Sequence, residues 1–269
     1  MTYNILALGG DGVGPEVLDS GIQVANAVAE KVNLDLSFNH DLLHGASWEK
    51  YGTFCRSETI TAALESDAVL VGAVGGPEWD DIKVEGGPEM QDGLMRLRKE
   101  MDAFVGLRPA KSYSALYGNT PFLHEHIDGA EILILREMCG GVMFSNPRGM
   151  SVGDEGRWAY DTASYSEKEI RRFARAGFYF AQNRKGKLVS ADKANVMESY
   201  KLWRTVTEEV SAEFPEINYA SMYVDNCAYQ MIKSPRDFDV IIGCNFLGDI
   251  LSDLAAIISG GLGMLPSAC

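Results

Sequence analysis

The sequence lacks the features that mark membrane-spanning, secreted and zinc-binding proteins. None of its apolar runs is long enough to cross a bilayer, and the opening stretch MTYNILALGG has no basic segment ahead of its short apolar run, so we expect no signal peptide. Five scattered cysteines form no CxxC pair, which removes the usual zinc and disulfide-exchange motifs. The cytoplasm is therefore the expected compartment, and we expect most of the cysteines to be small core residues.

Positive charge is also scarce. The 269 residues include 24 Lys and Arg against 38 Asp and Glu, for a net charge of -14. Nucleic acids and anionic membranes bind basic surfaces, so neither is an expected partner. A small anionic ligand would depend on a few local Arg or Lys side chains. The 46% hydrophobic content is sufficient for one large or two modest globular domains.

Apolar, strand-like runs alternate with helical patterns, which is typical of an α/β fold with a largely parallel sheet. The expected strands cover residues 4–10, 68–74, 131–137, 187–193, 219–225 and 239–243. The expected helices cover residues 14–32, 92–104, 166–184, 197–214 and 245–258. The polar, glycine-rich segment 75–93 predicts a long loop of the kind that often borders a site.

The first strand-to-helix turn, GGDGVGPEV, invites a dinucleotide-binding interpretation because it joins a strand to a helix. However, the fingerprint G-x-G-x-x-G requires glycine where this chain has Pro15. Proline at that position is well suited to the first turn of a helix, where no N–H is needed. Spacing alone therefore favours a tight structural turn over a cofactor site and leaves both open.

Asp249 and Asp253 lie four residues apart in NFLGDILSDLAAII, so a helix would place both carboxylates on one face, where they repel each other. The apolar neighbours predict a largely buried helix, in which carboxylates are costly unless a positive group meets them. Helix N-capping explains an Asp at a helix start, but it cannot explain Asp253, one turn inside the helix. The pair therefore requires a positively charged partner.

The basic residues recur beside glycine, proline and strand ends. Arg98, Arg108 and Arg136 could bind carboxylates through bidentate hydrogen bonds, and for each one alone a surface salt bridge is the simpler interpretation. Lys193 and Asn195 follow an expected strand, where the carboxyl end of a parallel sheet usually places its ligand groups.

Asp225 likewise ends an expected strand, with helix N-capping as the alternative. Tyr165, taken alone, is best explained as an aromatic side chain that packs at a strand end.

Seven motifs in order resemble the metal-dependent β-decarboxylating dehydrogenases, the isocitrate and isopropylmalate dehydrogenase family. The resemblance is collinear from Asn4 to Ala268 and rests on GDGVGPEV, LRKEMDAFVGLRPAK, LREMCGGVMFSNPRG, YDTASYS, SADKANV, YVDNCA and GDILSD. It implies a two-domain α/β fold without the ordinary Rossmann fingerprint. The first domain would comprise residues 1–103 and 260–269, and the second, dimerisation and metal-binding domain would comprise residues 104–259.

The resemblance also implies a set of site residues. In this family, carboxylates matching Asp249 and Asp253 bind Mg²⁺ or Mn²⁺, together with one matching Asp225 from the neighbouring subunit of a homodimer. Oxygen ligands suit such hard cations. The resemblance assigns the role of base to Lys193 and the role of proton donor to the enol carbon to Tyr165. It implies that the substrate carboxylates are bound by Arg98, Arg108 and Arg136. Contacts to the nicotinamide half of NAD are implied for Gly76, Pro77, Gln91 and Asn195.

The implied reaction is NAD-dependent oxidation and decarboxylation of a 2-hydroxy acid. Leu94 and Met95 precede Arg98 and suit an alkyl substituent, as in 3-isopropylmalate of leucine biosynthesis, although both could simply face the core. Gln91 stands where family members acting on that substrate usually carry Glu. Activity on homoisocitrate, or on tartrate and malate, is the alternative within the enzyme class.

The end of the chain, GGLGMLPSAC, corresponds to a point where the family continues into an adenosine-binding loop. The resemblance therefore leaves a second class of function open, a non-catalytic fragment or accessory subunit. A chain without that loop is expected to bind substrate and metal weakly and NAD hardly at all.

Overall fold

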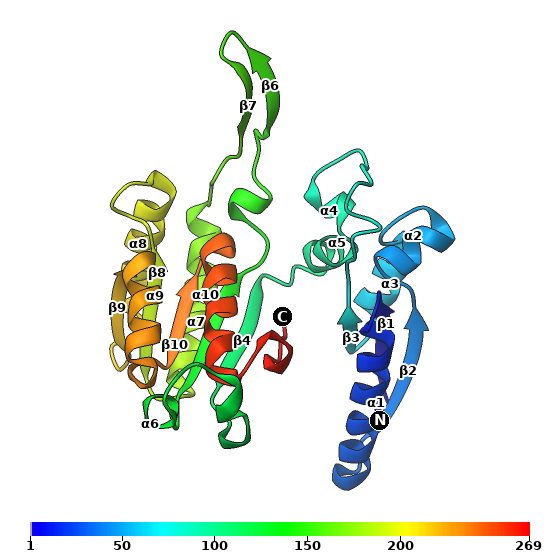
Figure 1. Cartoon of the computed structure of the whole chain (residues 1–269), viewed down its shortest axis with the longest axis horizontal. Helices are drawn as coiled ribbons and strands as arrows, with labels where there is room; N and C mark the ends of the chain where they lie inside the picture. Colours follow the sequence, from blue (N-terminus) through cyan, green and yellow to red (C-terminus); the bar gives the residue numbers. More distant parts are fainter. Residues whose placement is uncertain (1) are drawn as a thin grey trace. The chain divides into compact units, whose positions relative to one another are not determined.

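A computed structural model of the protein describes residues 2–269, and Figure 1 shows its course. The chain divides into two compact units, Met1–Asp102 and Ala103–Cys269. Residues 260–269, which the resemblance assigned to the first domain, pair here with the second unit. The Leu107 amide donates to the Ala268 carbonyl at 2.7 Å and the Ala268 amide donates back at 3.2 Å. This pairing satisfies backbone groups on a strand that lies at a sheet edge.

The first unit is built on a three-stranded parallel sheet in the order β2-β1-β3. Its strands are β1 (Thr2–Gly10), β2 (Asp35–Asp41) and β3 (Ala68–Ala73). Its helices are α1 (Gly14–Val32), α2 (Gly45–Tyr51), α3 (Ser57–Glu65), α4 (Pro88–Gln91) and α5 (Gly93–Glu100). The predicted loop 75–93 therefore contains one short helix, α4.

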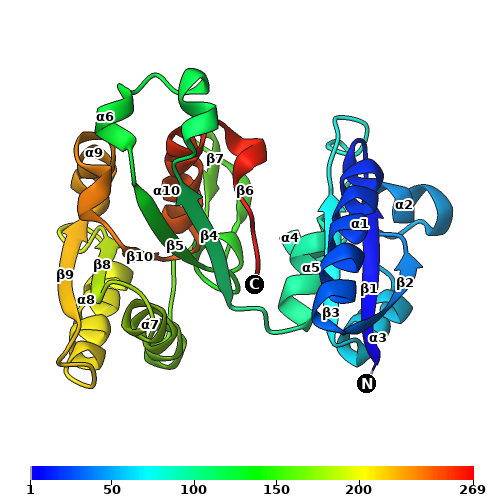
Figure 2. The ribbon, with the colours of Figure 1, turned by 90° about the horizontal axis from the view of Figure 1, so that it is seen from below.

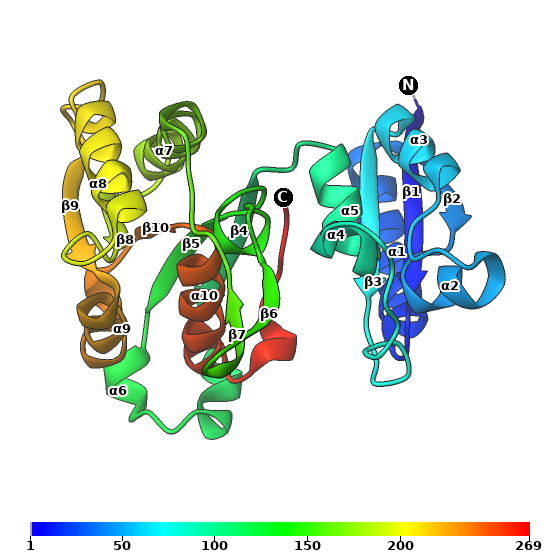
Figure 3. The same ribbon diagram turned by 90° about the horizontal axis from the view of Figure 1, so that it is seen from above.

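Alternation along β3 shows how this sheet is covered on both faces (Figure 3). Val69 and Val71 pack with the buried cluster that includes residues of α3 and α5. Gly72, the next residue along β3, faces α1 on the other side of the sheet, because a Cβ there would lie 2.3 Å from the Gly14 carbonyl oxygen. Glycine at this position therefore lets the start of α1 lie directly against the sheet.

The second unit contains a five-stranded sheet in the order β4-β5-β10-β8-β9, parallel except for the edge strand β4. The strands are β4 (Val105–Lys111), β5 (Glu131–Glu137), β8 (Lys187–Asp192), β9 (Asn218–Tyr223) and β10 (Val240–Gly243). The longer helices are α7 (Glu167–Gln182), α8 (Glu198–Ser211), α9 (Val224–Lys233) and α10 (Asn245–Ser259), and α6 (His124–Ile127) is a single turn. The predicted largely parallel α/β architecture is confirmed.

Helices α7 and α8 cover one face of this sheet, and α9 and α10 cover the other (Figure 2). Alternation along β5 explains the two layers. Leu133 and Leu135 join the cluster with α7 and α8, whereas Ile132 and Ile134 join the cluster with α9 and α10. The strand is therefore apolar on both faces, as buried parallel strands usually are.

A two-stranded hairpin, β6 (Gly149–Gly153) and β7 (Gly156–Tyr160), extends away from the sheet of the second unit (Figure 1). The sequence analysis did not predict it. Met150 and Val152 are about four-fifths exposed on the hairpin, at 81% and 79%. Within residues 2–269, no helix has both the length and the apolar character needed to cross a membrane.

Candidate functional site

Arg136 provides the positive partner of Asp249 in this structure. Arg136 lies near the carboxyl end of β5, and its Nη1 forms an ion pair with Oδ1 of Asp249 on α10. The close approach depends on Gly248, because a Cβ there would come within 3.0 Å of the Arg136 backbone. Asp253 is exposed one turn further along α10. The two carboxylates therefore lie on one helix face that solvent reaches.

Asn245, the first residue of α10, holds Arg136 in place from the other side. The buried Asn245 side chain accepts a hydrogen bond from Arg136 Nε at 2.9 Å and donates one to the Gly140 carbonyl at 3.1 Å. Its backbone N–H donates to the Tyr165 hydroxyl at 3.0 Å. These contacts join the end of β5, the start of α7 and the start of α10 in one polar network.

Tyr165 is buried, and its ring packs edge-on against Trp203. Its hydroxyl donates to Oε2 of Glu137 at 3.1 Å, in addition to the bond that it accepts from Asn245. Burial, followed by the proximity of Cys244 and Glu137, raises the pKa of Tyr165 far above its ordinary value. The predicted proton-donor role of Tyr165 stays a prediction, and the contacts favour a positioning role.

Glu137 is a buried carboxylate that the sequence analysis missed. It is 2% exposed and accepts backbone hydrogen bonds from Cys139 at 2.8 Å and Gly140 at 2.9 Å. Burial raises its pKa, and these hydrogen bonds offset the rise only in part. Its place directly after a site arginine at a strand end was the available sequence signal.

Lys193 and Asp225 meet at the carboxyl ends of the neighbouring strands β8 and β9. Lys193 Nζ lies 2.7 Å from Oδ1 of Asp225. This hydrogen bond is the main reason that the pKa of Asp225 lies below its usual value. Tyr223, rather than Asp225, holds the N-cap position of α9, so the capping alternative does not account for Asp225.

The structure does not bring Asp225 together with Asp249 and Asp253 within one chain. Among residues 2–269, no group of three or more His, Cys, Asp or Glu side chains could hold a metal ion. The prediction assigned Asp225 to the site of a neighbouring subunit, and a single chain leaves that assignment untested. The two-residue set that one chain supplies is Asp249 and Asp253.

Arg98 has an unsatisfied buried donor. It lies in the last turn of α5, and its Nε is buried without a hydrogen-bond partner in the described part of the chain. A carboxylate ligand would satisfy such a donor. Leu94 on the same helix packs against the core of the first unit, as the simpler interpretation expected, whereas Met95 is half-buried and lies outside that core cluster.

The remaining predicted residues lie in loops or at element ends. Arg108 is half-buried on the edge strand β4, opposite Ile134 of β5. Gln91 is exposed at the end of α4, Asn195 is exposed in the turn after β8, and Pro77 is exposed in the loop after β3. Each unit thus carries part of the predicted residue set at the carboxyl end of its parallel strands.

Asp11 organises the loops at the carboxyl edge of the first unit, and the sequence analysis missed it. It is 5% exposed and accepts hydrogen bonds from the backbone N–H groups of Gly45, Ala46 and Gly75 at 3.2, 2.8 and 2.8 Å. His44 Nδ1 lies 2.8 Å from the same carboxylate. Gly75 has a φ of +104°, and a Cβ there would meet no atom within 4 Å. The backbone at Gly75 is therefore open to close approach by a ligand.

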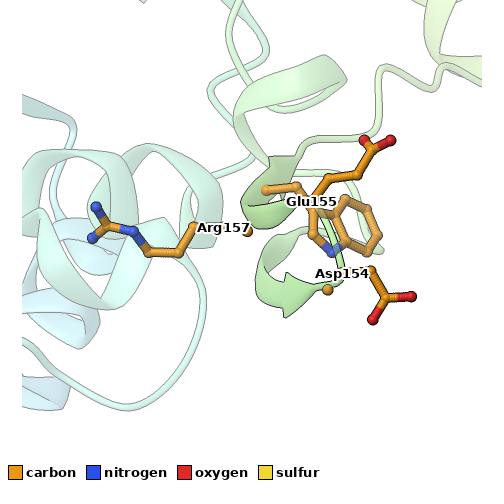
Figure 4. A pocket seen from close by; sticks show the side chains of 6 residues that line it. Asp154, Glu155 and Arg157 are labelled. Atoms are coloured by element: carbon orange, nitrogen blue, oxygen red, sulfur yellow. The ribbon is translucent and has the colours of Figure 1, made fainter.

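The second unit has a hollow near Lys193 and another on the β6–β7 hairpin. One has a volume of about 660 Å³ and is lined mainly by apolar side chains together with Lys193, Arg148 and Asp161. The other lies at the tip of the β6–β7 hairpin, where Asp154, Glu155 and Arg157 point in different directions (Figure 4). Only the first brings a predicted site residue into a concave surface.

These features define a class: a two-unit α/β protein with basic and acidic side chains gathered where its parallel strands end, as in enzymes of small anionic substrates. Comparison with known families makes this specific. The family described as isocitrate/isopropylmalate dehydrogenase matches residues 4–269, and the chain belongs to this family of oxidoreductases. The predicted family is therefore confirmed.

Individual relatives agree. The chain is 46% identical over 269 residues to 3-isopropylmalate dehydrogenase of Xanthomonas campestris pv. campestris, which covers all of this chain and 75% of the relative. The corresponding enzyme of Aquifex aeolicus is 42% identical over 266 residues, covering 99% of this chain and 72% of the relative. The chain thus spans about three quarters of these relatives.

Solved structures show the same fold. Isocitrate dehydrogenase from Methylococcus capsulatus matches 99% of this chain and 74% of its own length, with a TM-score of 0.85 and 27% sequence identity. The apo form of a β-decarboxylating dehydrogenase from Thermococcus kodakarensis covers 98% of this chain and 71% of its own length, with a TM-score of 0.75 and 27% identity.

Proposed function

We propose that the protein catalyses the NAD-dependent oxidative decarboxylation of 3-isopropylmalate to 4-methyl-2-oxopentanoate, a step of leucine biosynthesis. The observation that carries this proposal is the 46% identity, over the whole chain, to relatives named for 3-isopropylmalate. The side chains gathered at the strand ends of the two units support it, because they are the acids and bases that a 2-hydroxy diacid substrate requires.

A divalent cation, Mg²⁺ or Mn²⁺, is the proposed metal. Asp249 and Asp253 fit it, because they offer hard oxygen donors on one solvent-accessible helix face. Asp225 of the neighbouring subunit would complete the set. In this arrangement Arg136 competes with the cation for Asp249, so the cation would release the Arg136 guanidinium toward a substrate carboxylate.

The proposed cofactor is NAD. The open backbone at Gly75 and its anchorage on Asp11 fit a ligand that approaches the loop after β3, where Gly76 and Pro77 lie. Gln91 and Asn195 are the other proposed contacts. When bound, NAD would accept the hydride from C2 of the substrate, and the cation would polarise the oxygen on that carbon.

The chain's own residues would supply binding and proton transfer. Lys193 is the proposed base, whose neutral amine would take the proton of the substrate hydroxyl, and its contact with Asp225 holds Nζ at the strand end. Arg98, Arg108 and Arg136 are the proposed ligands of the substrate's carboxylates. Tyr165 remains the predicted proton donor, while its contacts support a role in holding Asn245.

The isopropyl group would be recognised by apolar side chains of α5. Met95 is the better supported candidate, since Leu94 packs against the core. A pocket with such a wall would leave the extra carboxylate of isocitrate desolvated and unpaired. The cost of an unpaired buried charge, on the order of several kcal/mol, corresponds to a preference of roughly a hundredfold or more.

Turnover with matched substrates tests the proposal. NADH formation is compared for 3-isopropylmalate and isocitrate with the same Mn²⁺ and NAD, and calorimetric binding of each acid with Mn²⁺ provides an independent ranking. We expect 3-isopropylmalate to be preferred in both measurements and a chelator to remove the preference. Equal handling of the two acids would contradict the substrate assignment.

A further inference from the structure

Arg204 on α8 forms a two-pronged ion pair with a fully buried carboxylate. Its Nε donates to Oδ2 of Asp192 and its Nη2 donates to Oδ1, both at 2.8 Å. Asp192 is completely buried at the last residue of β8. Bidentate pairing fixes the orientation of both groups more closely than a single hydrogen bond does.

Asp192 also holds the backbone of the turn that carries Lys193. Its Oδ1 also accepts a hydrogen bond from the Ala194 backbone N–H at 2.9 Å. The carboxylate therefore bridges Lys193 from the residue before it to the residue after it. Such a local side-chain-to-backbone bond restricts the backbone dihedrals of the bridged residue.

Arg204 also touches the strand that leads to Asp225. Its guanidinium carbon lies 4.7 Å from the ring centroid of Tyr223, a cation–π contact. Tyr223 is the last residue of β9, and it pairs directly with Asp192 in the parallel register. One guanidinium therefore contacts both members of the final rung of β8 and β9, immediately before Lys193 and Asp225.

We infer that Arg204 is a positioning residue that sets the geometry of the Lys193–Asp225 pair. The pair itself is exposed, with side-chain accessibilities of 32% and 67%, and exposed ion pairs fix geometry poorly by themselves. The order must come from the backbone beneath, which the Asp192–Arg204–Tyr223 cluster holds. The functional meaning of that geometry rests on the proposed roles of Lys193 as base and Asp225 as a metal ligand.

The chain offers a matched control in the same sheet, at the opposite end of its parallel strands. Arg184 Nε donates to Oδ1 of Asp239 at 2.8 Å, and Asp239 is also buried and accepts a backbone N–H, from Lys185, at 2.8 Å. Asp239 directly precedes β10, whereas Asp192 ends β8, and the two strands are parallel. Arg184→Lys thus disturbs the same kind of ion pair away from the proposed site.

The experiment measures how fast the Lys193 amine is acylated by acetic anhydride, with mass spectrometry of each lysine peptide. Asp225→Asn removes the carboxylate that pairs with the amine, so its labelling rate sets the upper limit. For an exposed ion pair, this rate is up to about fivefold faster than in the unmodified chain. Arg204→Lys keeps the charge but loses the bidentate hydrogen bonds. We expect this variant and Tyr223→Leu to accelerate Lys193 labelling toward that limit. Tyr223→Phe, which keeps the ring, should label like the unmodified chain.

The same variants are tested for Mn²⁺ binding by thermal shift and for turnover. Arg204→Lys should weaken the Mn²⁺ response and lower kcat while leaving the KM for NAD unchanged, and Arg184→Lys should change neither. Lys193 labelling at the unmodified rate in Arg204→Lys, or an Asp225→Asn variant without faster labelling, would overturn the inference. Equal calorimetric binding of 3-isopropylmalate and isocitrate by the unmodified chain would instead count against the proposed function, and the labelling result does not depend on that binding.

Discussion

Glu137 shows at the scale of one residue how the fold perturbs a charge. Its carboxylate accepts hydrogen bonds from two backbone N–H groups and the Tyr165 hydroxyl. Those bonds favour the charged form, but burial disfavours it more strongly and raises the pKa. A carboxyl group with a raised pKa binds its proton more tightly in the folded chain than in the unfolded chain.

This sign gives a pH prediction. Above an unfolded pKa of about 4.5, the folded state holds the Glu137 proton more strongly, so the stability that this group contributes is lost as pH rises through its folded pKa. Glu137→Gln lacks the titration. We expect the difference in unfolding free energy, unmodified minus variant, to fall with rising pH and then to level off. Urea unfolding at several pH values measures it, and a difference that does not change with pH would refute the prediction.

Asp253 supports a second prediction at this scale. A cation that binds only the folded chain stabilises it by mass action, by about 2.7 kcal/mol at a hundred times its dissociation constant. Asp253→Asn should remove most of the melting-temperature rise caused by Mn²⁺. Asp154→Asn, the same chemical change at the exposed hairpin tip, is the control and should retain the rise. An unaltered Mn²⁺ response in Asp253→Asn would remove Asp253 from the metal site.

At the scale of elements, the residue at which a helix begins determines where the neighbouring site side chains lie. The N-cap of α7, Ser166, directly follows Tyr165 and forms a capping box. Its Oγ accepts from the Glu169 N–H at 3.3 Å, and Glu169 Oε2 accepts from the Ser166 N–H at 2.7 Å. This box satisfies backbone donors that would otherwise lack partners. It thereby determines where the helix starts and where Tyr165 enters the core.

Ser166→Ala tests that element. Loss of the cap should lower the unfolding free energy by about 0.5–2 kcal/mol, since the first-turn N–H groups lose an acceptor. Ser211→Ala, on the exposed last turn of α8, removes a hydroxyl that donates only to a helical carbonyl and should be nearly neutral. Urea unfolding compares the two variants, and equal losses of unfolding free energy would contradict a stabilising role of the capping box.

At the scale of the whole molecule, the exposed hairpin indicates association. A two-stranded hairpin is marginally stable by itself in water, yet β6–β7 presents Met150 and Val152 to solvent. Large exposed apolar side chains of this kind mark interaction surfaces. We therefore expect a homodimer through residues 104–259, in which Lys193 and Asp225 serve the neighbouring site.

Light scattering at micromolar concentration tests the assembly. The measured mass should be twice the chain mass of 29.4 kDa. Val152→Asp should shift the equilibrium toward the monomer because it would place a charge within the expected dimer contact, whereas Val24→Asp on α1 of the first unit, 65% exposed, should not. A monomeric mass for the unmodified chain would exclude the shared-site arrangement.

The sequence by itself predicted the family and part of the secondary structure; it did not predict β2, β4, the β6–β7 hairpin or the helices α2, α3, α4, α6 and α9. Alternating apolar runs predicted every strand of the five-stranded sheet except β4, because side-chain periodicity depends only on near neighbours in the chain. The spacing of Asp249 and Asp253 placed both on one helix face for the same reason. Seven motifs in order identified the dehydrogenase family, and the whole-chain match confirmed it.

Tertiary structure decided which distant residues meet. The pairs Arg136–Asp249, Lys193–Asp225 and Asp11–His44 join residues at least 32 positions apart, and no local pattern encodes them. The fold also places the Tyr165 hydroxyl between Glu137 and the Asn245 N–H, a position that the residues beside Tyr165 do not indicate. The physical reason is that strand order and helix packing bring such groups together, and these depend on the burial of the whole apolar core rather than on the residues beside each group.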